Sequence, residues 1–394
     1  MNPETPPPPS LSVALICFSH AWGGLEIMVT KIAAALSTRG HRVFLISPSG
    51  SPIEAEAVRQ GLTHISMTPR MKYLDPKIIG ELGRLFRRHQ IGIALATLSR
   101  DISTVVLAGR FSPGTKLVYF QQMQFGHSKR DLFHRWTYSA LDSWITLTRA
   151  MKNSVVQNTI VKERILDVIP FGTDRTVFDP RRSSRKHGRS VFQLPNNSLL
   201  VGFIGRLDKQ KGCEEFIRAA AIVRKSAPKS LFILAGEETH GEPGYADSLR
   251  SLSDSLGLKQ HIRFLPFTRE VPLFLASLDV LAVPSYSETF GYVAIEGMAM
   301  GLPVVGTNAG GLPEIIVDGE TGFLVPPRNP EELARPIISL LKKPALRKAM
   351  GTKGQKRVKE RFDFRKNIKM LEALFQRLSS TGFPSATSEL SVGA

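Results

Sequence analysis

The sequence predicts a doubly wound α/β protein built from two domains in series. Its 394 residues exceed the usual span of about 100–200 residues for a single domain. Short apolar runs typical of buried strands alternate with amphipathic helical patterns, and the alternation begins again near residue 191. Strands and helices in this order form parallel sheets with helices on both faces.

The first half contains five predicted strands, with a clear helical pattern between the first two. That helix is predicted over residues 24–39, because apolar residues recur every three or four positions from Leu25 to Leu36 and Gly40 follows as a stop. We therefore expect the first Rossmann-like domain at residues 11–180. The strand runs are residues 13–18, 42–47, 91–97, 116–120 and 143–148.

The second half repeats the alternation, which predicts a second domain over residues 191–362. Its strand runs are residues 199–205, 231–236, 262–265, 280–284 and 304–306. Its helical patterns cover residues 213–226, 245–256, 271–277 and 291–300. The remaining segments are a flexible proline-rich leader at 1–10, a solvated basic interdomain linker at 181–190, a helix at 364–378 and a flexible tail at 379–394.

The charge balance narrows the classes of partner. A net charge of +18 favours nucleic acid, an anionic membrane or a phosphorylated substrate. The excess is spread over both halves, and the densest run, 181–189, contains no aromatic residue for stacking on bases. Nucleic acid is therefore not an expected partner. The two cysteines, Cys17 and Cys213, are far apart and match neither a disulfide framework nor a zinc motif, which favours a reducing compartment.

Several nucleotide and hydrolase motifs are absent from the sequence. No G-x-G-x-x-G follows the first strand of either half, and there is no G-x-x-x-x-G-K-[ST] or G-x-S-x-G. No Asp-x-Asp pair suited to a metal–diphosphate complex is present either. These observations argue against a nicotinamide dehydrogenase, a P-loop NTPase and a nucleophile-elbow hydrolase.

The richest candidate site runs from residue 284 to residue 327. A predicted strand ends at 284 and a helix begins near Gly291, so unpaired backbone N–H groups and the positive end of a helix dipole can bind phosphate there. Glu288 precedes that helix and Glu296 lies inside it, among apolar residues where a purely structural carboxylate is costly. Both carboxylates can accept paired hydrogen bonds from sugar hydroxyls.

Three further loops that lead into helices are also candidate binding sites. After the strand at 199–205 come Arg206 and Lys211, which can bind phosphate oxygens at the carboxyl edge of a parallel sheet. After the first strand, Gly23 and Gly24 lead into a helix, where phosphate binding and plain turn formation compete. In the loop 309–314, Glu314 is either a partner of a helix dipole or a ligand contact.

Together these segments resemble the GT-B-fold retaining glycosyltransferases of family 4 (glycosyl transferase group 1). The resemblance covers nearly the whole chain and implies two Rossmann-like domains facing a central cleft. A nucleotide-diphosphate-sugar donor would bind mainly the C-terminal domain and an acceptor mainly the N-terminal domain, which the helix at 364–378 would complete. The matching segments are GGLE at 23–26, IPFGTD at 169–174, GRLDKQKG at 205–212, the E-x7-E of 288 and 296, and GGLPEIIVDGETGFLVPP at 310–327.

Roles follow from the resemblance by motif match. Arg206 and Lys211 would bind the donor diphosphate, Glu288 the sugar hydroxyls and Glu296 the ribose. The other donor-binding positions would be Gly23, Gly24, Gly205, Phe290, Gly291 and Tyr292. Cations and helix dipoles would stabilise the leaving diphosphate, so the resemblance implies neither a metal nor a cofactor beyond the nucleotide-sugar co-substrate.

One segment departs from the family pattern. Many relatives place a histidine soon after the strand corresponding to 116–120, whereas Gln121 or Gln122 occupies that place here and His127 follows later. A glutamine amide can still hold a sugar. His127 stays a candidate catalytic residue, with a loop or capping role as its other interpretation.

The resemblance also implies a biological setting. The acceptor would be a saccharide or a lipid-linked molecule in cell-surface polysaccharide, lipopolysaccharide or glycolipid assembly. We expect a cytoplasmic protein whose basic surface holds it on the inner face of the cytoplasmic membrane. A nucleotide- or anionic-lipid-binding protein of the same fold without transferase activity is the alternative. A phosphorylase would need a cofactor-bearing lysine, and an epimerase would lack the pair of glutamates.

Overall fold

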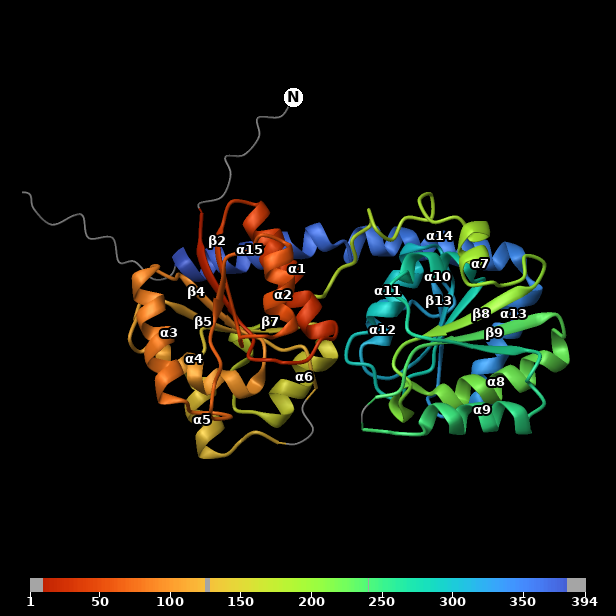
Figure 1. The fold of residues 1–394 in the computed structure, drawn as a ribbon, viewed down its shortest axis with the longest axis horizontal. Helices are drawn as coiled ribbons and strands as arrows, with labels where there is room; N and C mark the ends of the chain where they lie inside the picture. Colours follow the sequence, from red (N-terminus) through yellow and green to blue (C-terminus); the bar gives the residue numbers. More distant parts are fainter. Residues whose placement is uncertain (1–9, 125–127, 240, 381–394) are drawn as a thin grey trace, which may run out of the picture. The chain divides into compact units, whose positions relative to one another are not determined.

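The computed structural model describes residues 10–124, 128–239 and 241–380. They divide into two compact units, one of the described residues up to 169 together with residues 368–380, and one of the described residues from 170 to 367. Figure 1 shows that each unit contains a twisted sheet flanked by helices.

The first unit is built on a seven-stranded sheet in which every pairing is parallel, with the strand order β3-β2-β1-β4-β5-β6-β7. β1 pairs with β2 on one side and with β4 on the other, so the order of the strands reverses between β1 and β4. The strands are β1 (Ser12–Ile16), β2 (Arg42–Ser47), β3 (His64–Ser66), β4 (Ile93–Ala96), β5 (Lys116–Phe120), β6 (Ser143–Thr146) and β7 (Leu166–Val168).

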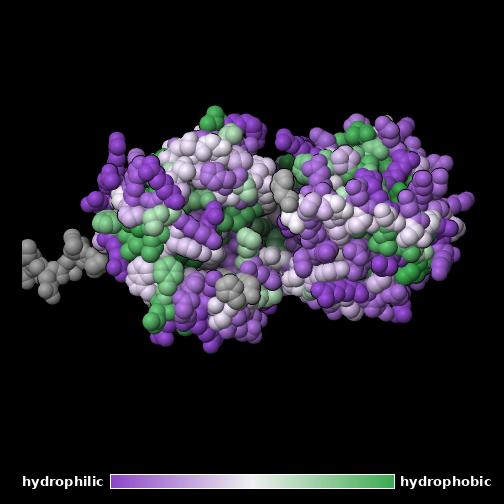
Figure 2. All heavy atoms as spheres, turned by 60° about the horizontal axis from the view of Figure 1, so that its bottom comes forward, coloured by the Kyte–Doolittle hydropathy of each residue, from purple (hydrophilic) through white to green (hydrophobic). Residues whose placement is uncertain are grey.

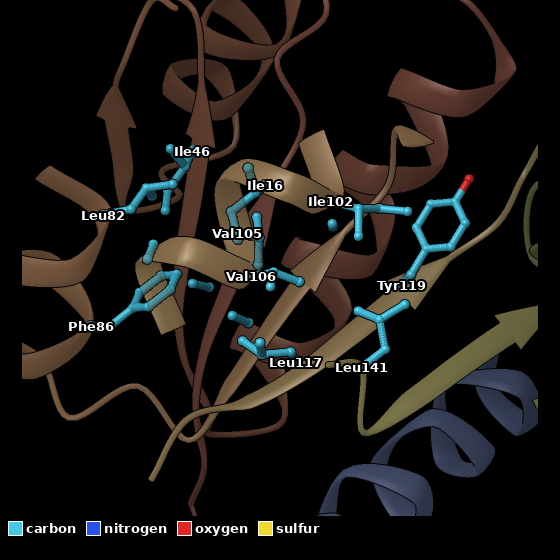
Figure 3. Close-up of a cluster of buried hydrophobic side chains, with 14 of the residues drawn as sticks. Ile16, Ile46, Leu82, Phe86, Ile102, Val105, Val106, Leu117, Tyr119 and Leu141 are labelled. Carbon is cyan, nitrogen blue, oxygen red and sulfur yellow. The ribbon is translucent and has the colours of Figure 1, made fainter. Parts of the chain in front are cut away.

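Helices connect these strands and close a hydrophobic core against the sheet. In Figure 3, Leu82 and Phe86 from α3 and Val105 and Val106 from α4 lie around strand residues such as Ile16. The helices are α1 (Gly24–Thr38), α2 (Pro52–Arg59), α3 (Pro76–Arg88), α4 (Ile102–Gly109), α5 (Leu132–Ser139) and α6 (Arg149–Asn158), with short 3-10 turns η1 (Ser99–Asp101) and η2 (Glu163–Ile165).

The last helix, α15 (Phe364–Ser380), belongs to the first unit from Ile368 onward. Its buried Glu372 accepts hydrogen bonds from Arg39 and, at 3.0 Å, pairs with His41, both at the end of α1. Its Arg377 contacts Asp167 of β7 at 2.9 Å. These contacts bind residues more than 200 positions apart in the sequence, so the C-terminal helix is part of the packing of this unit.

The second unit is built on a six-stranded sheet with the order β10-β9-β8-β11-β12-β13, again parallel throughout. β8 pairs with both β9 and β11, so the strand order reverses between β8 and β11. The strands are β8 (Leu199–Ile204), β9 (Ser230–Ala235), β10 (Ile262–Leu265), β11 (Val280–Val283), β12 (Val304–Thr307) and β13 (Gly322–Val325).

The core of the second unit is formed mainly by α8 and α13 packed against the sheet, with Phe216 and Phe232 in edge-to-face contact at its centre. The helices are α7 (Arg185–Val191), α8 (Cys213–Ser226), α9 (Tyr245–Ser255), α10 (Val271–Ser277), α11 (Tyr292–Ala299), α12 (Leu312–Ile315), α13 (Pro330–Lys342) and α14 (Pro344–Arg361), with the 3-10 turn η3 (Lys209–Lys211).

The predicted fold class is confirmed, since both sheets are parallel and have helices between successive strands. Three short strands, β3, β7 and β13, were not predicted; each has three or four residues and stands at a sheet edge, where burial is incomplete and the apolar pattern is weak.

The segment 181–190 is not the interdomain linker that its charge suggested. Its residues from Arg185 onward form α7, which packs on α10 inside the second unit. Arg189 is 1% exposed, and its guanidinium binds Asp279 and the carbonyls of Pro195, Asn196, Ser198 and Ser277. A buried arginine is tolerated because each of its three guanidinium nitrogens has a hydrogen-bond acceptor.

The expected flexible ends fall largely outside the described residues, which begin at Ser10 and end at Ser380. Ser379 and Ser380, expected in the tail, belong to α15 instead. The first of these donates a side-chain hydrogen bond to the carbonyl of Phe375 one turn earlier, which extends the helix beyond its predicted end.

Candidate functional site

The two loops with the strongest motifs lie on either side of the strand-order reversal in the second sheet. The loop after β8 contains residues 205–212, and the loop after β11 contains residues 284–291. The backbone N–H of Tyr286 donates to the carbonyl of Gln210 at 2.8 Å, which joins the two loops directly. In open α/β sheets this crevice at the carboxyl ends of the strands is where ligands bind.

Lys211 and Glu288, predicted separately from two motifs, form an ion pair. The Lys211 ammonium is 2.7 Å from Oε2 of Glu288, and both side chains are largely shielded, at 23% and 14% exposed. The hydroxyl of Ser285 also donates to Oε2 of Glu288, at 3.1 Å. Oε1 of Glu288 accepts no hydrogen bond from the described residues, so one oxygen of this carboxylate remains available for a ligand hydroxyl.

Arg206 lies in the same loop but is much more exposed, at 69%. Its guanidinium is 3.2 Å from Asp208, whose other oxygen accepts the backbone N–H of Lys211 and so caps the η3 turn. The aspartate was not predicted as a site residue, although Asp three residues before a turn's last N–H is a recognisable capping pattern. Asp208 thereby shapes the loop that carries both cations.

The start of α11 provides backbone donors at the same crevice. Gly291 caps the helix at φ +103°, and a side chain there would come within 2.6 Å of Leu312. The positive end of the α11 helix dipole lies at this first turn, where the N–H of Ala294 donates to the Gly291 carbonyl at 3.0 Å. This arrangement can bind an anion without a metal.

The side chains beside Gly291 are used for packing. Phe290 is buried and makes edge-to-face contact with Phe171, and the Tyr292 hydroxyl donates to the carbonyl of Gly172 at 2.8 Å. Burial raises the pKa of Tyr292 above its usual value, and the nearby charges of Glu296 and Asp174 raise it further. The rings of Phe290 and Tyr292 therefore fix the loop, and contact of their backbone with a ligand stays a prediction.

Glu296 lies in the second turn of α11 and is half-buried among apolar neighbours of the helix. Gly205 directly follows strand β8, and its carbonyl would lie 1.9 Å from a side chain added at Gly236. The structure thus places the predicted donor-binding residues 205, 206, 211, 288, 290, 291, 292 and 296 around one end of one sheet.

The glycine-rich loop 309–311 supports the Glu288 loop from behind. The N–H of Gly311 donates to the Glu288 carbonyl at 2.7 Å, and a side chain on Gly310 (φ +63°) would lie 2.0 Å from that oxygen. Close approach of the two backbones explains this glycine pair. Glu314 lies in the first turn of the four-residue helix α12.

Gly23 and Gly24 lie in the first unit, at the carboxyl end of β1 beside the reversal of its sheet. Gly23 caps α1, and its N–H donates to Glu26 Oε2 at 2.9 Å, while Ser19 donates to the other oxygen at 2.6 Å. The glutamate of the GGLE segment therefore has a capping role. Closure of these glycines over a donor held by the second unit stays a prediction.

Gln121 and Gln122, which follow β5, differ in their hydrogen bonding. The amide of Gln121 accepts the Trp144 indole N–H at 3.0 Å and donates to the Met123 carbonyl at 2.8 Å. Gln122 is 8% exposed, and neither its amide nitrogen nor its amide oxygen has a hydrogen-bond partner among the described residues. An unsatisfied buried amide is costly in a folded protein, so Gln122 is the better candidate for binding a ligand. His127 lies outside the described residues.

A buried carboxyl group, which the sequence reading missed, lies at the reversal of the first sheet. Asp101 is 3% exposed, and its Oδ2 accepts the backbone N–H of Phe18 at 3.0 Å, which ties the loop after β4 to the loop after β1. Burial raises the pKa of Asp101 to about 7, against the lowering effects of the Phe18 N–H and Arg100. The nearby thiol of Cys17 is also buried, which raises its pKa to about 12.

A separate cavity of about 590 Å³ in the second unit does not coincide with the crevice between β8 and β11. Its lining comes from residues 174–182 and 363–365 and includes neither Glu288 nor Lys211. Arginine and aspartate side chains already pair with one another there, as Arg181 does with Asp179 at 2.7 Å. The motif residues, and not the volume of this cavity, mark the candidate site.

The fold is that of the GT-B class of glycosyltransferases, which have two Rossmann-like domains; in this chain the strand order of each sheet reverses at one point, between β1 and β4 and between β8 and β11. The family model for glycosyl transferases group 1 matches residues 184–357, and that for glycosyltransferase family 4 matches residues 22–177. The chain belongs to this family of glycosyltransferases.

Two curated relatives match parts of the chain. D-inositol 3-phosphate glycosyltransferase of Mycolicibacterium smegmatis is 40% identical over 163 residues, which are 41% of this chain and 36% of that protein. The enzyme of the same name from Corynebacterium jeikeium is 31% identical over 221 residues, 55% of this chain and 52% of that protein. The matched segments thus span between about a third and about half of the length of these relatives.

The similar solved structures extend over nearly the whole chain. A glycosyltransferase from Rickettsia africae has a TM-score of 0.85 at 20% identity and covers 94% of this chain and 98% of its own. HepE of Anabaena, solved in complex with UDP, has a TM-score of 0.81 at 22% identity and covers 93% of this chain and 100% of its own. At such identities these likenesses establish the fold.

Proposed function

We propose that this protein transfers a sugar from a nucleotide-diphosphate-sugar donor to a hydroxyl acceptor. The observation that carries the proposal is the Lys211–Glu288 pair, because two motifs 77 residues apart place a cation and a carboxylate 2.7 Å apart at the sheet's reversal point. A diphosphate requires cations, and sugar hydroxyls require acceptors such as the carboxylate. Lys211 and Glu288 supply the cation and the carboxylate close enough together to contact one nucleotide-sugar.

The leaving diphosphate would be stabilised by this chain's own groups. Lys211 and Arg206 supply point charges, and the first turns of α8 and α11 supply backbone N–H groups and helix dipoles. The proposal therefore includes a metal-independent reaction. Retention of anomeric configuration follows if the acceptor attacks on the face that the diphosphate leaves and a phosphate oxygen takes the acceptor proton.

The first donors to test are uridine nucleotides. Similar structures of HepE from Anabaena contain UDP, UDP and glucose, or UDP-glucose. The curated relatives are named for transfer to inositol 3-phosphate, and WaaG, a structural neighbour, is named for lipopolysaccharide biosynthesis. A cell-envelope saccharide or lipid-linked acceptor fits this range of names.

The basic surface supports action at an anionic membrane on the cytoplasmic side. Residues 342–366 carry eleven lysine and arginine residues against Glu360 and Asp363, which accounts for half of the net charge of +18. On α14, the ammonium groups of Lys348, Lys356 and Lys359 have no ion-pair partner among the described residues. Among those residues, no helix is long and apolar enough to cross a membrane.

The test is a thermal-shift screen of UDP-, GDP- and ADP-sugars, followed by a product assay with the best donor. A ligand at about 100 times its Kd should stabilise the folded state by about 2.7 kcal/mol. Stabilisation by one donor class together with release of the nucleoside diphosphate would support the proposal. Stabilisation without turnover would favour a non-catalytic nucleotide-binding protein. No stabilisation by any nucleotide sugar would contradict both of these and leave the anionic-lipid-binding alternative.

A further inference from the structure

The first unit contains a second cavity that no sequence motif marked. Its volume is about 420 Å³, and its lining comes from the segment before α3, from η1 and α4, and from α5 with the segment before it. It lies beyond the carboxyl ends of β4 and β5, the edge at which open α/β sheets bind ligands. None of the candidate residues assigned above lines this cavity.

The polar lining of the cavity is basic. Arg100, Lys129 and His134 contribute side chains, and no described lining residue is acidic. Two of these groups have a carboxylate neighbour just outside the lining, since Arg100 is 3.7 Å from Asp101 and His134 is 2.5 Å from Asp131. Lys129 has no carboxylate partner among the described residues, so the lining has an excess of cations, which favours an anion.

Lys129 gives the clearest indication of a missing counter-charge. It is half-buried, and its ammonium has neither an ion pair nor a hydrogen bond to the described residues. Its backbone N–H donates to the Asn158 carbonyl at 2.8 Å, which fixes the position of the residue. Holding a cation partly out of water without a partner is unfavourable, and an anionic ligand would remove that penalty.

The other two basic groups are held in place by neighbours outside the cavity. Nδ1 of His134 is 2.5 Å from Asp131, whose pKa is lowered by hydrogen bonds from the backbone and the ring of His134. With Nδ1–H donated to Asp131, Nε2 can donate to a phosphate oxygen when the ring is protonated. Arg100 donates to the Phe18 carbonyl and lies 3.7 Å from Asp101, so its guanidinium is pre-positioned.

The same cavity has an apolar rim. Tyr73, Leu74 and Phe133 line it and are still 47%, 37% and 38% exposed. Their neighbours Met71 and Leu132 are 55% and 81% exposed. Figure 2 shows hydrophobic groups among the hydrophilic residues of this unit. Large apolar side chains gathered beside a basic pocket suit a ligand with an anionic group attached to an apolar portion.

We propose that this cavity binds the phosphate group of an amphiphilic acceptor, which makes the acceptor a lipid-linked phosphate. Lys129, Arg100 and His134 bind the phosphate oxygens. Tyr73, Leu74 and Phe133 contact the apolar portion next to it. This inference rests on the proposed transferase function, whose acceptor class it names.

The test measures binding by titration calorimetry with three probes: dihexanoyl phosphatidic acid, glycerol 1-phosphate and inorganic phosphate. The wild-type protein should bind the lipid probe at least tenfold more tightly than glycerol 1-phosphate. Lys129→Ala should weaken both organic probes about tenfold, as expected for one lost charge-assisted contact. Lys162→Ala, which removes an exposed lysine of the same unit outside the cavity, should leave both affinities unchanged.

The apolar contacts are tested separately with Leu74→Ser. This exposed residue is not needed for the core, and its replacement should reduce the preference for the lipid probe while leaving glycerol 1-phosphate binding unchanged. If glycerol 1-phosphate binds the wild-type protein as tightly as the lipid probe, the ligand is a free phosphate ester and the lipid assignment is wrong. If Lys129→Ala binds all probes like the wild type, the cavity is not the anion site.

The same samples separate this inference from the proposed function. Thermal stabilisation by a nucleotide sugar should be the same in Lys129→Ala and in the wild type, because Lys129 is not part of the candidate donor site. Donor stabilisation without binding of any phosphate probe would overturn the inference and leave the transferase proposal standing. Probe binding that depends on Lys129, without any donor response, would keep an anion site and overturn the transferase assignment.

Discussion

Lys211 and Glu288 supply each other's counter-charge across the crevice between two loops. The pair is shielded, so neither group is a simple surface charge, and one carboxylate oxygen of Glu288 is still available. A donor would place its phosphates near Lys211 and its sugar hydroxyls near Glu288. Each residue is therefore expected to act on the substrate directly, and their mutual contact fixes their positions.

Glu288→Ala and Lys211→Ala should each lower kcat by about 10²–10³ or more, because each removes a contact to the reacting part of the donor. Circular dichroism should report a folded protein for both. Lys209→Ala is the matched control, since Lys209 is an exposed lysine of the same η3 turn, and it should keep nearly full activity. Wild-type turnover in both of the first two variants would refute the site.

The neighbouring glutamines should separate structure from function. Gln121→Ala removes the acceptor of the buried Trp144 N–H and should destabilise the fold by about 1–3 kcal/mol, measured by urea unfolding. Gln122→Ala removes an amide without partners among the described residues, so it should cost little stability but reduce turnover. Equal losses of stability in the two variants would contradict this division.

Asp101 should make stability depend on pH. Its pKa is raised to about 7 in the folded protein, so the folded state holds a proton that the unfolded state has already released. Its contribution to stability is therefore present below about pH 4 and is lost as the pH rises through about 7. The stability of the wild type relative to Asp101→Asn should fall over this window by up to about 1.4 kcal/mol per pH unit. A difference that is constant from pH 4.5 to 7.5 would show that Asp101 does not titrate there.

At the scale of the elements, close backbone contacts hold the loops of the crevice together. Gly212 caps α8 at φ +69°, and an added side chain would lie 2.1 Å from the Pro284 carbonyl at the end of β11. Gly310 has the same relation to the Glu288 carbonyl. Glycine is required at these points by contact as well as by dihedral angle, and the contacts set the spacing of the motif residues.

Gly212→Ala should therefore be far more harmful than an otherwise similar change. Gly244→Ala is the matched control, because Gly244 also caps a helix at positive φ (+80°) but has nothing within 4 Å of an added side chain. The control should cost about 1 kcal/mol, whereas Gly212→Ala should cost several times more and weaken donor binding. The two free energies of unfolding, measured by urea denaturation, should differ accordingly; similar values would mean that the loops can separate freely.

At the scale of the whole molecule, the charge of +18 has an identifiable source. Half of it comes from residues 342–366, around α14, where several lysines lack partners among the described residues. Buried or paired cations such as Arg189 belong to the fold and cannot contribute to membrane binding. The unpaired cations are the ones available to an anionic surface.

Reversing the charges of Lys348, Lys356 and Lys359 to glutamate should reduce binding to phosphatidylglycerol vesicles at least tenfold at low salt. The control reverses Lys225, Lys229 and Lys259, which are exposed in the same unit and change the net charge equally. Co-sedimentation should separate the two variants, and raised salt should weaken wild-type binding. Equal loss in both variants would attribute binding to net charge and not to α14.

The sequence predicted several elements well because their patterns come from burial, although the 18-residue helix α14 and the helices α3 and α13 were not predicted. Helix α8 and strands β2, β5 and β10 agree with their predicted bounds, since a buried strand or an amphipathic helix must repeat its apolar residues at a fixed spacing. The motif residues of the second unit were also found, because glycine, charge and strand end occur together in the chain. Short edge strands such as β3 carry too few buried residues to give such a pattern.

What the sequence by itself determined is the class of fold, the bounds of elements such as α8 and β5, and the motif loops that carry Arg206, Lys211, Glu288 and Glu296. The tertiary structure alone decided which side chains meet. It paired Lys211 with Glu288, used Gln121 for Trp144 while leaving Gln122 without a partner, and turned the basic segment at 181–190 into a helix around the buried Arg189. The physical reason is that burial and hydrogen-bond satisfaction depend on contacts between distant segments, and no local pattern records these contacts.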